Sequence, residues 1–105
     1  MKQIINNKIY DTETAELIYE YRHSFFIQNI WLPKGYGFKE WEKVSVYKTK
    51  NNNYFKYYKY IENDFNYQDR ERIEPTTLEN IKEIIKELNP DKFIELFGKI
   101  DLEEA

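Results

Sequence analysis

Cysteine is absent from this chain of 105 residues, so disulfides, thiolate metal sites and cysteine nucleophiles are excluded. Only three glycines are present, too few for a phosphate-binding loop of the Walker type. Gly35-Tyr36-Gly37 lacks the third glycine of a dinucleotide fingerprint and is predicted to be a turn. No apolar run approaches the roughly 20 residues that cross a bilayer, and the first residues lack the apolar core of a signal peptide. We therefore expect a cytoplasmic protein without membrane contact.

Histidine is also scarce, because His23 is the single one in the chain. Its neighbour Ser24 is a candidate nucleophile by residue type, but side chains adjacent in sequence rarely project toward one another as a nucleophile and its base must. The carboxylates show no spacing typical of a metal loop. We expect no catalytic residues, no metal and no cofactor, and hence no enzyme.

Aromatic residues are abundant, with 10 Tyr, 7 Phe and 2 Trp making up 18% of the chain. A core of this size cannot hide all of these rings, and tyrosine is enriched at recognition surfaces. The alternative is that the tyrosines line half-buried faces of a sheet, where they also fit well. Both interpretations stay open for each tyrosine.

The length predicts one domain spanning residues 1–105. The segment Lys2–Tyr10 predicts a β-hairpin, because Asn6-Asn7 tolerates the positive φ angles of a tight turn. A helix is predicted over Thr12–Tyr21. The residues at helical spacing are Ala15, Ile18, Tyr21 or Arg22, and Phe25. The segment 22–41 is irregular, with a possible strand at 25–27 and a loop at 33–37.

The second half of the chain gives clearer patterns. Lys43–Thr49 and Tyr54–Ile61 predict a hairpin with an asparagine-rich turn, and residues 62–74 predict a polar loop. Thr76 with Glu79 forms a capping box that opens a helix reaching Leu88. Pro90 then opens a last helix, which Gly98 ends. The predicted fold class is α+β: a small antiparallel sheet of two β-hairpins packed against an N-terminal helix and two C-terminal helices.

The net charge of −3 conceals a division along the chain. Residues 34–60 hold seven lysines against two glutamates, and residues 71–105 hold twice as many acidic as basic residues. A basic, ring-rich hairpin suits a surface that tracks phosphates and stacks bases, although strand lysines also serve to prevent edge aggregation. The acidic helices suit a surface that imitates nucleic acid or docks on a basic partner. Lys82, Lys86 and Lys92 favour instead an ordinary mixed helix surface.

The partner-binding residues that this reasoning selects all belong to the central hairpin. They are Lys48, Lys50, Asn52, Tyr54, Lys56, Tyr58, Lys59 and Tyr60.

Three segments carry a resemblance to a family. Lys8–Ile18 resembles the pattern K-x-Y-D-T-E-T-A-x-x-I, Val46–Phe55 is similar to L-Y-K-T-K-x-G-x-Y-F, and Asp91–Gly98 to D-x-Y-x-x-x-F-G. These patterns are typical of small proteins of phages and mobile elements in low-GC and related bacteria. The chain departs from them by having Asn52 or Asn53 at the usual turn glycine, by an aromatic insertion over 25–38, and by lacking a Gly-Gly after the second strand.

The resemblance implies a phage or mobile-element protein of anti-CRISPR type. We expect it to inhibit a host defence nuclease, such as a CRISPR effector, by stoichiometric, non-catalytic binding in the host cytosol, as a monomer or homodimer. The alternative is a nucleic-acid-binding module that uses the basic, aromatic hairpin of residues 43–61.

Overall fold

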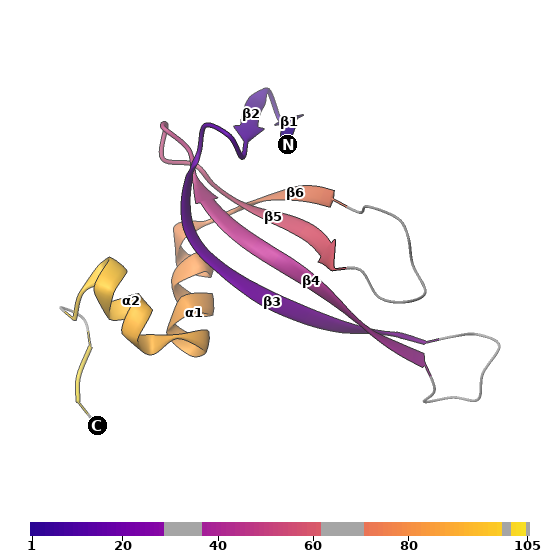
Figure 1. Cartoon of the computed structure of the whole chain (residues 1–105). Coiled ribbons are helices and arrows are strands. Elements are labelled where there is room, and N and C mark those ends of the chain that lie inside the picture. The colour runs from indigo at the N-terminus through magenta and orange to yellow at the C-terminus, as the bar shows by residue number, and fades with distance from the viewer. Residues whose placement is uncertain (29–36, 62–70, 100–101, 105) are drawn as a thin grey trace.

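Six strands and two helices make up the computed structural model, which describes residues 1–28, 37–61, 71–99 and 102–104. Strands β1 (Lys2–Ile5) and β2 (Lys8–Asp11) form a two-stranded sheet of their own. Strands β3 (Glu16–Gln28), β4 (Gly37–Lys48), β5 (Tyr54–Ile61) and β6 (Glu71–Thr76) form an antiparallel sheet in chain order. The helices α1 (Leu78–Leu88) and α2 (Pro90–Phe97) follow at the C-terminal side (Figure 1).

The predicted N-terminal helix is wrong, because Thr12–Tyr21 forms a turn followed by the start of β3. The Asp11 carboxylate accepts a hydrogen bond from the Glu13 N–H at 3.0 Å, and the Asp11 carbonyl accepts one from Ala15 at 3.1 Å. These bonds form a single capped turn of the helical type, which the chain does not continue into a helix. The aromatic and β-branched residues that follow favour a strand, and pairing with β4 makes that strand the stable choice.

Two further parts of the predicted organisation change. The two predicted hairpins do not join in one sheet, because β1 and β2 form a sheet of their own. The long strands β3 and β4 take up most of the segment 22–41 that was predicted to be irregular. The possible strand at 25–27 lies inside β3. The predicted loop 62–74 ends in β6, whose polar residues pair with β5 at the sheet edge. Residues 62–70, like the predicted loop at 33–36, lie outside the described residues.

The two predicted asparagine turns are confirmed, whereas the turn predicted at 35–37 lies outside the described residues except for Gly37, which begins β4. Asn6 and Asn7 have φ angles of 51° and 62°, and Asn52 has 61°. Asparagine adopts this left-handed conformation more readily than most residues, so it can form a tight turn in which glycine is also common. The Thr49 hydroxyl also accepts a hydrogen bond from the Asn53 N–H at 3.0 Å, which fixes the β4–β5 turn.

The two C-terminal helices are confirmed as well, with one shift at a cap. Thr77, rather than Thr76, caps α1, and its hydroxyl accepts from the Asn80 N–H at 3.2 Å. Asn89 both ends α1 and caps α2, where its side chain accepts from the Lys92 N–H at 3.1 Å. Gly98 ends α2 with a φ of 82°, a conformation that glycine adopts without strain.

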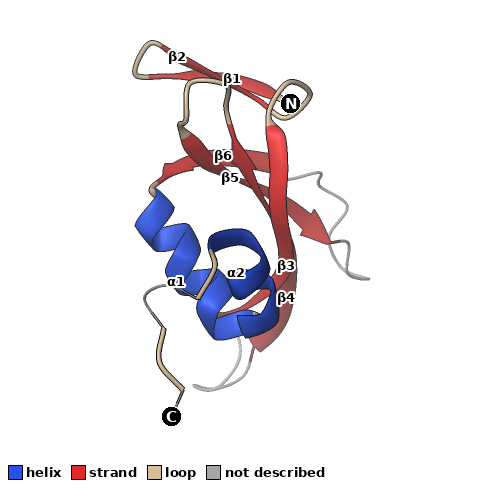
Figure 2. Ribbon diagram, turned by 90° about the vertical axis from the view of Figure 1, so that its left-hand side faces the viewer, coloured by secondary structure: helices blue, strands red, loops and turns tan. Residues whose placement is uncertain are grey.

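Different elements pack on the two faces of the four-stranded sheet: the helices on one face, and the β1–β2 hairpin at one end of the other (Figure 2). We call the side that carries Val46 and Tyr54 the helix face, because Ile81 and Ile85 of α1 and Phe93 of α2 pack there. The opposite side, which carries Tyr47 and Phe55, is the hairpin face. There Tyr10 of β2 packs edge-on against Phe55, with ring centroids 5.4 Å apart. Alternation along β5 therefore supplies two separate cores.

The molecule is elongated. Its radius of gyration is 16.7 Å, whereas a compact chain of this length has about 13 Å. One reason is that β5 pairs with β4 only over Trp41–Lys48. Beyond that point residues 37–40 pair with 25–28 of β3 alone, as a two-stranded arm (Figure 1).

Truncation of Phe55 tests the packing of the hairpin on the sheet. The ring is fully buried and stacks on Tyr47 at 5.1 Å between centroids, so Phe55→Ala is expected to lower the free energy of unfolding by about 3–5 kcal/mol. Leu88 is 53% exposed, and Leu88→Ala serves as the control, with an expected change below about 0.5 kcal/mol. Urea unfolding followed by circular dichroism measures both, and equal losses would contradict the assignment of this core.

Candidate interaction surfaces

The eight residues selected from the sequence divide among three places. Lys50 and Asn52 are exposed in the β4–β5 turn, and Lys59 is exposed on the hairpin face. The other five belong to the helix face by strand register: Lys48, Tyr54, Lys56, Tyr58 and Tyr60. Of these, Lys56, Tyr58 and Tyr60 are buried, while Lys48 and Tyr54 are half-buried. The structure therefore does not bring the eight together in one exposed surface.

An ion pair between a buried glutamate and a half-exposed arginine explains why Tyr58 is buried. Glu42 of β4 is only 6% exposed, and both of its carboxylate oxygens accept hydrogen bonds from the Arg72 guanidinium of β6. That guanidinium lies 3.8 Å from the centre of the Tyr58 ring, in cation–π geometry. The pair thus spans β5 from β4 to β6 across the face of this ring. Tyr58 here holds three strands together and is covered by Arg72.

Tyr21 lies on the same face, and the pKa of its hydroxyl is raised above the ordinary value for tyrosine. Burial raises the pKa of Tyr21 to about 12, with smaller contributions from Tyr58 and the Glu74 carboxylate. Burial, together with Glu74, also raises the pKa of Tyr58. The helix face therefore favours neutral tyrosines.

The hairpin face carries an exposed row of cations, of which Lys59 belongs to the residues selected from the sequence and Arg22 lies outside the predicted hairpin. Arg22 of β3 lies opposite Lys43 of β4, which lies opposite Lys59 of β5. We call these three residues the cation row. The Glu20 carboxylate forms a salt bridge with Lys43, with 3.3 Å between Oε1 and Nζ. It also accepts a hydrogen bond from the Ser45 hydroxyl at 3.0 Å. Arg22 opened the segment that was predicted to be irregular, and only the period-two pattern of β3 indicates that it lies beside Lys43.

The helices present acidic residues outward. Glu79, Glu83 and Glu87 are exposed at four-residue spacing along α1, and we call them the glutamate ridge. The lysines between them turn toward α2, where Lys82 Nζ lies 5.3 Å from the Phe97 ring and Lys86 Nζ lies 5.2 Å from that of Phe93. Lys86 also reaches Glu83 at 3.5 Å. The lysines of α1 are thus on the flank toward α2, while the outward ridge carries carboxylates.

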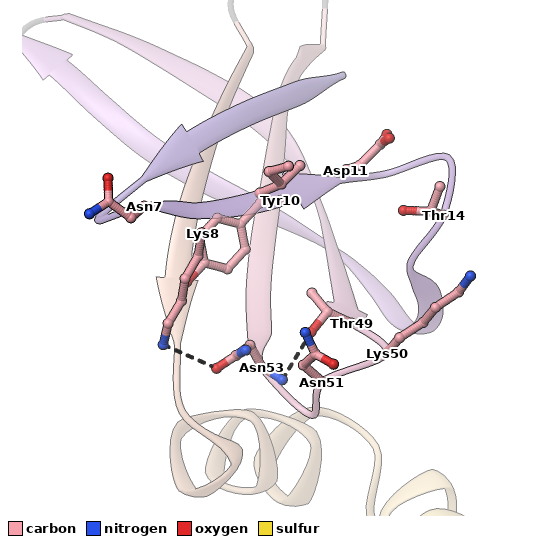
Figure 3. A pocket seen from close by; sticks show the side chains of 10 residues that line it. Asn7, Lys8, Tyr10, Asp11, Thr14, Thr49, Lys50, Asn51 and Asn53 are labelled. Atoms are coloured by element: carbon pink, nitrogen blue, oxygen red, sulfur yellow. Dashed lines mark hydrogen bonds between the residues drawn. The ribbon is translucent and has the colours of Figure 1, made fainter.

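Two of the segments that carry the family resemblance meet in space. A cavity of about 370 Å³ lies between the β1–β2 hairpin and the β4–β5 turn, lined by side chains that include Lys8, Tyr10, Thr49 and Lys50 (Figure 3). Lys8 Nζ donates to the Asn53 side-chain oxygen at 3.5 Å across it. The motifs at 8–18 and 46–55 therefore build one structural unit, in which the hairpin docks on the turn.

Comparison of the chain with protein-family models, with curated proteins and with solved structures gives no match. In the ranges that the structure describes, neither helix has the length and apolar character needed to span a bilayer.

The titration of Tyr21 predicts how stability depends on pH. The pKa of Tyr21 is higher in the folded state than in the unfolded chain, so protonated Tyr21 stabilises the fold. This contribution to the free energy of unfolding is complete below pH 10 and is lost as the pH rises to about 12. Tyr21→Phe is therefore expected to reduce the loss of stability over this interval. Thermal unfolding at a series of alkaline pH values measures the effect.

A second variant identifies the cause of this pH dependence. Glu74→Gln removes one of the charges that raise the pKa of Tyr21 and should shift tyrosinate formation to lower pH. Ultraviolet absorbance of the tyrosinate measures this shift. If Tyr21→Phe leaves the alkaline loss of stability unchanged, the assigned environment of Tyr21 is wrong.

Proposed function

We propose that this protein inhibits a defence nuclease of its bacterial host, such as a CRISPR effector, by binding it stoichiometrically and without chemistry of its own. The proposal starts from the resemblance of Lys8–Ile18 and Val46–Phe55 to proteins of phages and mobile elements. It is supported by the way these two segments dock on one another around a common cavity. On this proposal the protein acts in the host cytosol, as a monomer or homodimer.

The observation that carries the proposal is the glutamate ridge. Residues four apart in a helix are separated by about 6 Å along the axis, so Glu79, Glu83 and Glu87 form an evenly spaced row of negative charges. Like charges at this spacing weaken a helix. Among the described residues a lysine, Lys86, offsets this at Glu83, while Glu79 and Glu87 form no ion pair. Asp91 and Glu95 are exposed at the same spacing on α2 and extend the negative surface.

The charge of this surface favours a particular kind of partner. CRISPR effectors hold their guide–target duplex in a positively charged channel. A rigid helix with regularly spaced carboxylates is complementary to such a channel, and long-range attraction would speed the encounter. Lys82 lies toward the Phe97 ring of α2, whereas Lys86 lies near the Phe93 ring and also pairs with Glu83 of the ridge. Occupation of the channel would exclude the nucleic acid and stop cleavage.

Removing the charge of the ridge tests the proposal. The triple variant Glu79→Gln, Glu83→Gln, Glu87→Gln is expected to raise the concentration needed for half-inhibition of the host effector on the order of tenfold or more. Its fold should be retained, because the three side chains are exposed. The measurement is cleavage of a DNA target by the purified effector, titrated with each protein to equimolar amounts and beyond.

A matched triple variant controls for net charge. Glu13, Glu16 and Glu104 are exposed outside α1 and α2, and their replacement by glutamine removes the same charge from other parts of the surface. This variant should inhibit as the parent does. Equal weakening by the two triple variants would refute the ridge as the contact, and an unmodified protein that neither binds nor inhibits the defence nucleases of its host would refute the function.

A further inference from the structure

The cation row lies on the part of the hairpin face that the β1–β2 hairpin does not cover. Arg22 and Lys59 are exposed, and the Lys43 side chain is 51% exposed. Neighbouring strands are about 4.8 Å apart, so the three cations fall within roughly 10 Å of one another. Within the described ranges, Lys43 alone of the three forms an ion pair, with Glu20.

This arrangement is unfavourable for the isolated fold. Like charges directly opposite each other on paired strands repel, and the register makes two such pairs, Arg22 with Lys43 and Lys43 with Lys59. Glu20 offsets part of the repulsion at Lys43, and Glu71 lies opposite Lys59 at the far end of the row. An anion that spans the row would relieve the rest, which favours a ligand with several linked negative charges.

Aromatic rings flank the row on the same face. Trp41 precedes Lys43 by two positions on β4 and is 42% exposed, and the half-buried Tyr57 precedes Lys59 by two positions on β5. Residues two apart on a strand are separated by about 7 Å. A base of a strand whose phosphates follow the cation row can therefore reach the exposed indole. Acidic peptides offer charge without such a planar group, so the rings favour nucleic acid.

We propose that the hairpin face binds a single strand of nucleic acid, with Arg22, Lys43 and Lys59 contacting successive phosphates and Trp41 stacking on a base. An open sheet face with cations and an exposed ring suits a single strand, whose bases are free to stack. The site lies on the face of the sheet opposite to the helices, so it is separate from the glutamate ridge. Its test needs no nuclease, and its failure leaves the proposed function untouched.

The first experiment measures binding of oligo(dT) and oligo(U) of about 15 nucleotides by fluorescence anisotropy at several salt concentrations. With three phosphate contacts the affinity should fall roughly 20-fold between about 50 and 200 mM salt. Arg22→Ala with Lys59→Ala should weaken binding at low salt by on the order of tenfold and flatten the salt dependence. Both side chains are exposed, so the double variant should keep its fold, which circular dichroism checks.

The matched control removes two lysines from the other end of the hairpin. Lys48→Ala with Lys50→Ala makes the same change of charge near the β4–β5 turn and should bind as the parent does. Absence of binding at low salt would overturn the proposal. So would equal weakening by the two double variants, or equally tight binding of an oligo-glutamate peptide, since either result would mean a nonspecific attraction between charges.

The stacking contact has its own readout. In a Trp31→Phe background Trp41 is the only tryptophan, and its fluorescence should be quenched when oligo(dT) binds. Trp41→Ala should lose on the order of tenfold in affinity, and Trp41→Phe should recover part of it because a ring is restored. Binding without quenching, or with no loss in Trp41→Ala, would overturn the stacking role.

Discussion

The register of β4 between β3 and β5 is the constraint on which the rest of the structure depends. Along β4, Val44 and Val46 point to the helix face and are fully buried, while Trp41, Lys43 and Ser45 point to the opposite side. A slip of one residue would place the valines in water and the lysine beneath α1. The same register sets Arg22, Lys43 and Lys59 side by side, so the core and the exposed cations are determined together.

Opposite charges lie on opposite sides of this sheet. On the helix face, α1 and α2 expose their carboxylates, while Lys82 and Lys86 of α1 approach the Phe97 and Phe93 rings. On the hairpin face, the cations collect in one row across three strands. The net charge of −3 hides this separation. Since long-range fields depend on where charges lie, two surfaces of opposite sign suit two partners of opposite sign.

Local signals in the sequence were sufficient to predict the two asparagine turns and the two C-terminal helices. Asn6-Asn7 and the 51–53 asparagines predicted turns because of their tolerance of positive φ, and Pro90 and Gly98 predicted the limits of α2. These features depend on a few adjacent residues. The resemblance to mobile-element proteins also rests on short motifs and stays a prediction.

The long strand β3 and the exposed cations could not be predicted locally. The apolar residues of 15–25 fit a helical spacing as well as a strand, and Ile18 falls at an irregularity in the pairing, which breaks the alternation expected of a strand. Pairing with β4, some 25 residues away, decides between the two. Exposure in the hairpin was equally nonlocal: Tyr58 is covered by Arg72 of β6, and Tyr54 packs against the core that α1 and α2 form with Val46.

Cross-strand nuclear Overhauser effects in the isotope-labelled protein would test this account most directly. The account predicts backbone contacts that link Arg22 to Lys43 and Lys43 to Lys59, together with strand-type coupling through residues 16–28. Helical contacts over residues 12–21, or pairings displaced by one residue along β4, would contradict it.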